Sequence, residues 1–263
     1  MSDTEKLISD YSDLINEHRA WLKPFGKLRL NKWEKLLQNN AEAAICEAAT
    51  RRLLSKHGVE IEPYEDPSSG GPDFSCIKDN ERFYAEVTCV TQEKAMRKTG
   101  LTDGSQYTFK PLTKVFMDEI RNKTTQCSNL NTVCILVIGT LHPQIGHICF
   151  CKDFAEDVLM ATPKIGAQWD NEKKRVADKL CKITELHNSS FVKSKKEKAN
   201  EIEEVRKTVS ALLLCSFGTK LPRTIGVLHP KPNYFFERAL LPKIEFCRLA
   251  EGYQSGRFKV EWI

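Results

Sequence analysis

The chain lacks a long apolar run and an apolar export signal. No stretch approaches the roughly 20 apolar residues that a membrane span requires, and residues 1–15 are acidic and amphipathic without an apolar core. We therefore expect a cytoplasmic protein with no membrane partner. With 263 residues, 41% apolar and 29% charged, the composition is that of a globular rather than a disordered chain. The length allows one large domain or two small ones.

The closely spaced cysteines of small disulfide-linked domains are also absent. Ten cysteines are scattered along the chain, most of them among apolar neighbours, so we interpret them as reduced, buried thiols. An alternative is a zinc site built from His142, His147, Cys149 and Cys151. Alternate residues of a strand would place both cysteines on one face, but the spacing is unlike the usual paired C-x-x-C form. Buried thiols are therefore the favoured interpretation.

Strong charge of either sign is missing, because the formal net charge is only +5. A positive excess favours a polyanionic partner through phosphate contacts, although charged helical faces are usually solvated surface. The C-terminal part contains no recognisable catalytic motif. Its aromatic cluster, residues 234–236 near Lys231 and Arg238, could stack on nucleic acid, but burial in the core is favoured.

The N-terminal part is predicted to be helical over residues 3–56. Apolar residues recur there at intervals of three and four, Pro24 and Gly26 interrupt the pattern, and Asn40 can cap the helix that follows. Strands are then expected at 59–62, 74–77, 83–90 and 132–138, with a loop over 91–110 and a helix from Pro111 to about Lys123. This order predicts an α/β (α+β) fold, with a mixed central sheet flanked by helices.

Beyond residue 140 the patterns are weaker. We expect a strand at 147–151, a helix at 152–160, two long polar helices at 170–188 and 197–213, and strands at 224–228, 243–249 and 258–262. The predicted organisation is an N-terminal helical segment (1–40), a core (41–150), and a helical and strand elaboration (151–263) packed on that core.

Two acidic residues lie on neighbouring predicted strands. Asp73 stands at the start of one strand after Gly71-Pro72, and Glu86 lies inside the next, which is apolar. Two carboxylates on adjacent strands are suitable oxygen ligands for Mg²⁺, and an acid in an apolar run needs a partner. The alternatives are that Asp73 is only a turn residue and that Glu86 lies on a solvated sheet face with Tyr84 and Thr88.

A helical Glu, then Gly-Pro-Asp-Phe at 71–74, then Ala-Glu-Val at 85–87 resembles the PD-(D/E)xK nuclease superfamily, which has the restriction-endonuclease-like fold. The resemblance covers about Glu42 to Ile138. It implies that Asp73, Glu86 and the backbone carbonyl of Val87 bind Mg²⁺, or Mn²⁺. Such a metal lowers the pKa of a bound water and offsets charge on the phosphate.

The resemblance also implies a further acidic ligand from the preceding helix. Glu47, eleven residues before Gly58, is close to the family's spacing. Glu42 is the alternative on the same helix, about 140° away around the helix axis. Either residue could instead be a solvated helix residue.

The lysine expected two residues after Glu86 is missing, because that position is Thr88. Lys123 continues an inward-facing stripe of the next helix, and with Gln126 it resembles a motif of relatives whose lysine has migrated. The alternative is a lysine whose stem covers apolar surface while its amine reaches water. Lys110 and Lys114 are weaker candidates for the same role.

We therefore expect a metal-dependent nuclease that hydrolyses phosphodiester bonds in DNA, with RNA as the other compatible nucleic acid. Its catalytic residues would be Asp73, Glu86, Glu47, Lys123 and Gln126. The alternative is a catalytically inactive nuclease-like fold that binds nucleic acid or a protein, and a third reading is an unrelated α/β protein in which these acids are far apart. The resemblance leaves a homodimer open.

Overall fold

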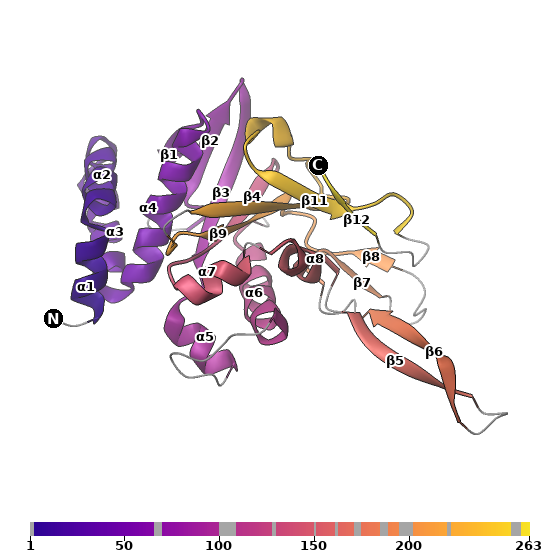
Figure 1. Ribbon diagram of the computed structural model, residues 1–263. Helices are drawn as coiled ribbons and strands as arrows, with labels where there is room; N and C mark the ends of the chain where they lie inside the picture. Colours follow the sequence, from indigo (N-terminus) through magenta and orange to yellow (C-terminus); the bar gives the residue numbers. More distant parts are fainter. Residues whose placement is uncertain are drawn as a thin grey trace.

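The computed structural model describes residues 3–65, 70–99, 109–127, 130–149, 151–160, 163–170, 175–184, 189–194, 202–219, 222–253 and 259–263. Residues 99, 109–111, 148–149, 163–170 and 175–184 are described by their backbone alone. The chain forms a mixed α/β protein in which N-terminal helices precede an eight-stranded sheet, with further helices packed against that sheet (Figure 1). None of the described helices is long and apolar enough to cross a membrane.

The N-terminal helices follow the predicted pattern. They are α1 (Asp3–Asp10), α2 (Ser12–Leu22), the 3-10 helix η1 (Lys23–Phe25), α3 (Lys27–Asn39) and α4 (Ala41–Lys56). The predicted break is confirmed, because Pro24 lies in η1 and Gly26 adopts a φ of 101°, which favours glycine. The side chain of Asn40 caps α4 by accepting a hydrogen bond from the Ala43 N–H at 3.1 Å.

The large sheet has the strand order β1-β2-β3-β4-β9-β10-β11-β12. Its strands are β1 (Glu60–Pro63), β2 (Phe74–Lys78), β3 (Glu81–Cys89), β4 (Cys134–Thr140), β9 (Ala211–Ser216), β10 (Arg223–Leu228), β11 (Glu245–Leu249) and β12 (Val260–Trp262). The pairs β3–β4, β4–β9 and β10–β11 are parallel, and the other neighbours are antiparallel. The predicted strands at 59–62, 74–77, 83–90, 132–138, 224–228, 243–249 and 258–262 are thus confirmed, with small shifts at their ends.

Helices cover both faces of the sheet (Figure 1). One core lies between the sheet and α4, and it contains Phe83, Ala85 and Val87 of β3. The other core contains Leu136 and Ile138 of β4. It is covered by α6 (Phe109–Thr124) and α8 (Lys152–Met160), whereas α5 (Gln92–Thr99) packs on α6 and α7 (Pro143–Cys149) on β9. All seven residues of β4 are buried, as expected for a doubly covered central strand.

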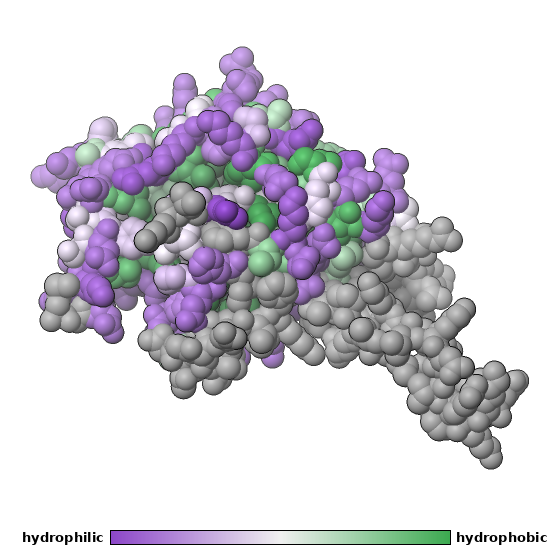
Figure 2. All heavy atoms as spheres, in the orientation of Figure 1, coloured by the Kyte–Doolittle hydropathy of each residue, from purple (hydrophilic) through white to green (hydrophobic). Residues whose placement is uncertain are grey.

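The described residues on the face shown in Figure 2 are largely hydrophilic, with hydrophobic side chains in small groups between polar ones. The aromatic cluster at 234–236 is divided. Phe236 is buried, as favoured from the sequence, whereas Tyr234 and Phe235 are exposed. Eight cysteines with described side chains are free thiols, and all but Cys151 are buried, so the interpretation as reduced, buried thiols holds for these.

Several predicted elements are wrong. The expected loop at 91–110 contains α5 and the start of α6, and the expected strand at 147–151 falls on the end of α7. The two long helices expected at 170–188 and 197–213 are absent from the described residues there. Instead, β5 (Pro163–Asp170) pairs with β6 (Arg175–Thr184), and β7 (Val192–Ser194) pairs with β8 (Ile202–Glu204). The predicted helix at 152–160 is confirmed as α8.

The strand β9, whose first three residues overlap the second expected helix, was not predicted. It is inserted between β4 and β10, and all six of its residues are buried. A short apolar run with both faces covered has no period that separates strand from helix. Because β9 pairs with β4, strands from segments 41–150 and 151–263 share one sheet.

Candidate functional site

Several residues singled out in the sequence line a cavity of about 520 Å³, namely Glu47, Asp73, Val87, Thr88 and Lys123. The cavity lies where α3 and α4 meet the start of β2, the end of β3 and the helices α5 and α6. Its wall is unusually rich in charge. The charged residues that line it are Arg29, Lys32, Lys35, Glu47, Glu65, Asp73, Lys94, Glu119 and Lys123.

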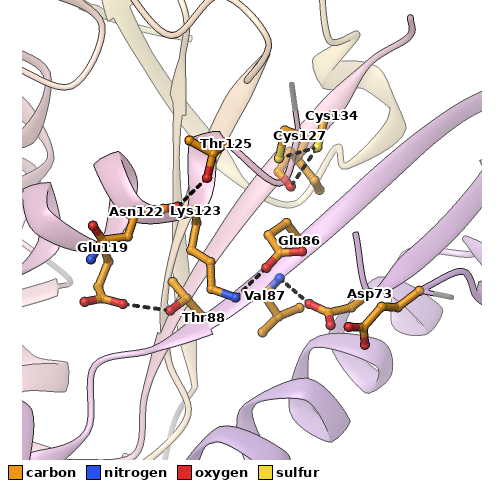
Figure 3. A network of polar contacts seen from close by, with 12 residues as sticks. Asp73, Glu86, Val87, Thr88, Glu119, Asn122, Lys123, Thr125, Cys127 and Cys134 are labelled. Atoms are coloured by element: carbon orange, nitrogen blue, oxygen red, sulfur yellow. Dashed lines mark hydrogen bonds and ion pairs between the residues drawn. The ribbon is translucent and has the colours of Figure 1, made fainter. Parts of the chain in front are cut away.

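Asp73 is held against β3 by a backbone hydrogen bond. It directly precedes β2, after Gly70 and Gly71, whose φ angles of 77° and 123° favour glycine. Its Oδ2 accepts a hydrogen bond from the Val87 N–H at 2.7 Å (Figure 3). This bond counteracts the effect of burial, which raises the pKa of the Asp73 carboxyl. Asp73 is therefore fixed by β3 and is more than a turn residue.

The carbonyl of Val87 lies on the same side of β3 as Asp73. The N–H and C=O groups of one strand residue point to the same edge, and the Val87 N–H points to Asp73. The register of β2 and β3 ends with Phe74 opposite Ala85, so no β2 residue is paired with Val87. The Val87 carbonyl and Asp73 thus offer two oxygen ligands for a metal at this edge.

Glu86 is buried in the middle of β3, with 1% of its surface exposed. Its Oε1 accepts a hydrogen bond from Lys123 Nζ at 2.7 Å (Figure 3). Its Oε2 is buried and has no hydrogen-bond partner among the described residues. Burial raises the pKa of Glu86 well above its ordinary value, Asp73 raises it further, and Lys123 opposes both. An uncompensated carboxylate oxygen of this kind is a suitable place for a cation.

Lys123 lies at the end of α6 and is about one third exposed, so its amine is shared between Glu86 and the cavity. Burial lowers its pKa, but Glu86 and Asp73 outweigh burial and raise the pKa overall. As predicted, the side chain of Lys123 points inward, toward Glu86 and the cavity. Lys114 is exposed on the same helix, and the side chain of Lys110 lies outside the described residues.

Gln126 lies away from this group. The helix α6 ends at Thr124, and the Gln126 N–H donates to the Lys123 carbonyl at 3.0 Å in the turn that follows. Its side chain is exposed and is not among those lining the cavity. The stripe that carries Lys123 inward therefore does not continue to Gln126.

The two candidate helical acids have different surroundings. Glu47 is half-buried, and its pKa is raised first by burial and then by Asp73, Glu65 and Glu86, so it belongs to the acidic group. Glu42 instead accepts the Gln92 N–H with both oxygens at 3.3 Å, at the N-terminus of α5. A carboxylate there satisfies a free helical N–H and complements the helix dipole.

Sequence reasoning missed a second polar network on the same wall. The Thr88 hydroxyl donates to Glu119 Oε2 at 3.0 Å, and Lys94 Nζ lies 2.5 Å from Glu119 Oε1. Glu119 is buried on α6, next to the fully buried Ile120. No signal marked these residues, because Glu119 falls within an apolar stripe and Lys94 within an expected loop.

The residues present fit a magnesium ion. Mg²⁺ is commonly held by one or two carboxylates and keeps several waters for substrate phosphates. Asp73, Glu86 and the Val87 carbonyl supply such a set of oxygen ligands. Within it, the Oε2 atom of Glu86 has no hydrogen-bond partner among the described residues and is available to a metal. Glu47, expected as a further ligand, does not complete a three-acid site, because the described residues contain no group of three or more His, Cys, Asp or Glu that could hold a metal.

This result also bears on the alternative zinc site. His142 lies just before α7, where its Nδ1 accepts the Ile145 N–H at 3.4 Å, and the Cys151 Sγ donates to the His147 carbonyl at 3.7 Å. The side chain of Cys149 lies outside the described residues. Contacts within and beside α7 account for the described members of this set, and Cys151, its one described thiol, is only half-buried.

No protein-family model, curated protein or solved structure matches this chain. The site is therefore interpreted from its own geometry.

Proposed function

We propose that this protein is a metal-dependent nuclease with a restriction-endonuclease-like core. The observation that carries the proposal is that Asp73 and the Val87 carbonyl lie together at one edge of β3, next to Glu86 with Lys123 on its Oε1 (Figure 3). The element order supports it as well. A helix, three antiparallel strands, the helix α6 and a fourth strand parallel to the third match the order expected from the resemblance, with α5 as an additional helix between β3 and α6.

Asp73, Glu86 and Val87 would hold Mg²⁺, or Mn²⁺ in its place. When bound, the ion supplies Lewis-acid polarisation of the phosphate and lowers the pKa of water. Glu47 would accept a hydrogen bond from water in the cavity, because it is half-buried beside Asp73. The attacking water would form the new P–O bond and give up a proton to solvent, and the leaving oxygen of the strand would take a proton from solvent as its own P–O bond breaks.

Lys123 would take the role of the lysine absent at Thr88. Its N–H groups are hydrogen-bond donors on a cation, and they lie between Glu86 and the cavity. Such a donor stabilises the negative charge that develops on the phosphate oxygens. Gln126 has no part in this proposal because it does not line the cavity.

DNA is the proposed substrate, with RNA as the comparison. Arg29, Lys32 and Lys35 of α3 line the same cavity as the acidic residues. Cations beside a metal site attract a phosphate backbone and make binding dependent on salt concentration. Lys32 also pairs with Glu65 at 2.6 Å, and Arg29 donates to the Pro63 carbonyl, which leaves Lys35 as the stronger candidate for contact with the substrate.

The proposal is tested by nicking of supercoiled plasmid with Mg²⁺, with Mn²⁺ and with a chelator, alongside a labelled RNA. We expect cleavage that the chelator stops, and its loss in Asp73→Asn and Glu86→Gln. Glu60→Gln is the matched control, because Glu60 is an exposed acid on β1 of the same sheet. Equal cleavage by all three variants would overturn the assignment.

A second candidate function is binding of nucleic acid without cleavage. The ion pair of Lys123 with Glu86 favours it, because this pair compensates the buried carboxylate without a metal. In that case neither metal supports cleavage, while DNA binding weakens steeply as salt is raised.

A further inference from the structure

A second lysine–carboxylate pair stands beside the first in the same cavity. Lys94 of α5 pairs with Glu119 of α6 at 2.5 Å, and the side chains are 30% and 3% exposed. Lys123 pairs with Glu86 at 2.7 Å with exposures of 29% and 2%. In each pair a buried carboxylate holds an amine that reaches the cavity wall.

Joining α5 to α6 does not by itself account for the buried pair. An exposed pair, Lys98 with Asp118 at 3.0 Å, already links the same two helices. A buried ion pair is often no more stabilising than apolar residues of the same size. The position that Glu119 occupies, next to the buried Ile120, would suit an apolar side chain. We therefore look for a functional reason for the charge of Glu119 at this position.

Thr88 connects this pair to the strand that carries Glu86. Thr88 lies two residues after Glu86, on the same face of β3, and its hydroxyl donates to Glu119 Oε2 at 3.0 Å. Glu119 thus accepts from Thr88 with one oxygen and faces Lys94 with the other (Figure 3 shows the contact with Thr88). The ion pair with Glu119 and the hydrogen bond from Thr88 to Glu119 therefore fix the position of the Lys94 amine relative to β3.

We propose that Lys94 binds a second phosphate group of the nucleic-acid strand, and that Glu119, held by Thr88, positions its amine. Lys94 and Lys123 come from neighbouring helices, line one cavity, and each keeps about a third of its side chain exposed. Two cations in one wall suit a ligand with anionic groups in succession, as the backbone phosphates of a polynucleotide are. This inference rests on the proposed function, because it assigns Lys123 to the phosphate that is cleaved.

The test measures cleavage and DNA binding in the full chain. For Lys94→Gln we expect a KM for an oligonucleotide raised about tenfold, with kcat within about twofold. The slope of log Kd against log salt should fall by about one, as for the loss of one phosphate contact. Lys94→Arg should restore the slope. Lys98→Gln is the matched control on the same helix, and its KM and slope should equal those of the unsubstituted protein.

The positioning role of Glu119 is tested by Glu119→Gln and Thr88→Val. Both keep Lys94, so the salt slope should stay near that of the unsubstituted protein, while KM rises less than in Lys94→Gln. Thermal unfolding of each variant identifies any loss of fold. If Lys94→Gln is poorly folded, the comparison of Lys94→Arg with Thr88→Val still decides, because only the latter should raise KM.

The two proposals fail in different ways. If neither metal supports cleavage by the unsubstituted protein, the nuclease assignment fails, and the salt slope of DNA binding still tests Lys94. If cleavage occurs but Lys94→Gln matches Lys98→Gln in both KM and slope, the inference about Lys94 is wrong.

Discussion

The Nζ atom of Lys123 lies 2.7 Å from Oε1 of Glu86, which joins the end of α6 to the middle of β3. The other oxygen of Glu86 is buried without a partner among the described residues. A single side chain thus leaves one oxygen for a cation while a lysine compensates the other.

The acidic group makes the stability of the metal-free protein depend on pH. Burial and Asp73, against the opposing effect of Lys123, raise the pKa of Glu86 from 4.5 to about 9, so between these values the folded state binds more protons than the unfolded state. The free energy of unfolding should therefore fall as pH rises through this window, and no loss from Glu86 is expected below pH 4.5. In Glu86→Gln the dependence should be shallower. Urea unfolding of both proteins from pH 5 to 9 measures the difference, and identical slopes would contradict it.

Mg²⁺ should stabilise the folded state at neutral pH. An ion that binds only the folded protein raises the free energy of unfolding, by about 2.7 kcal/mol at a hundred times its Kd. Binding needs ionised carboxylates, so the increase in Tm should be larger at pH 8 than at pH 6. Asp73→Asn should lose the increase and Glu60→Gln should keep it. A Tm increase of the same size in Asp73→Asn would place the ion elsewhere.

Substitution of Glu47 should affect cleavage, whereas substitution of Glu42 should affect the stability of the fold. Glu47→Gln removes a carboxyl whose pKa is raised by burial and by Asp73, so it should slow cleavage without lowering the free energy of unfolding. Glu42→Ala removes the acceptor at the N-terminus of α5 and should lower that free energy by about 1 kcal/mol. Urea unfolding and a cleavage assay on both variants test this contrast. The assignment fails if Glu47→Gln is the destabilised variant and cleaves normally.

Local pattern was enough to predict the part of the fold that carries the acids. Alternation in β3 and the preceding glycines placed Asp73 and Glu86 on neighbouring strands, and the stripe through Phe116 and Ile120 predicted an inward Lys123. The same stripe suggested Gln126, but α6 ends at Thr124, so the helical spacing no longer applies there.

The missed features depend on contacts between distant segments. Glu119 looks like an isolated polar residue in an apolar stripe until Thr88 and Lys94 are brought to it from β3 and α5. The strand β9 is defined by its parallel pairing with β4, from Ile135 with Ala211 to Thr140 with Ser216. Its own run of apolar residues gives no sign of that partner.

The most direct test of the central claim is the single-turnover rate of Mg²⁺-dependent DNA cleavage in Lys123→Met and in Lys123→Met combined with Thr88→Lys. Lys114→Met, an exposed lysine of the same helix, is the control. We predict that Lys123→Met lowers the rate about 10²-fold, the effect of losing one preorganised donor. The lysine restored at position 88 should recover part of it. Cleavage by Lys123→Met at the rate of the control would contradict the account.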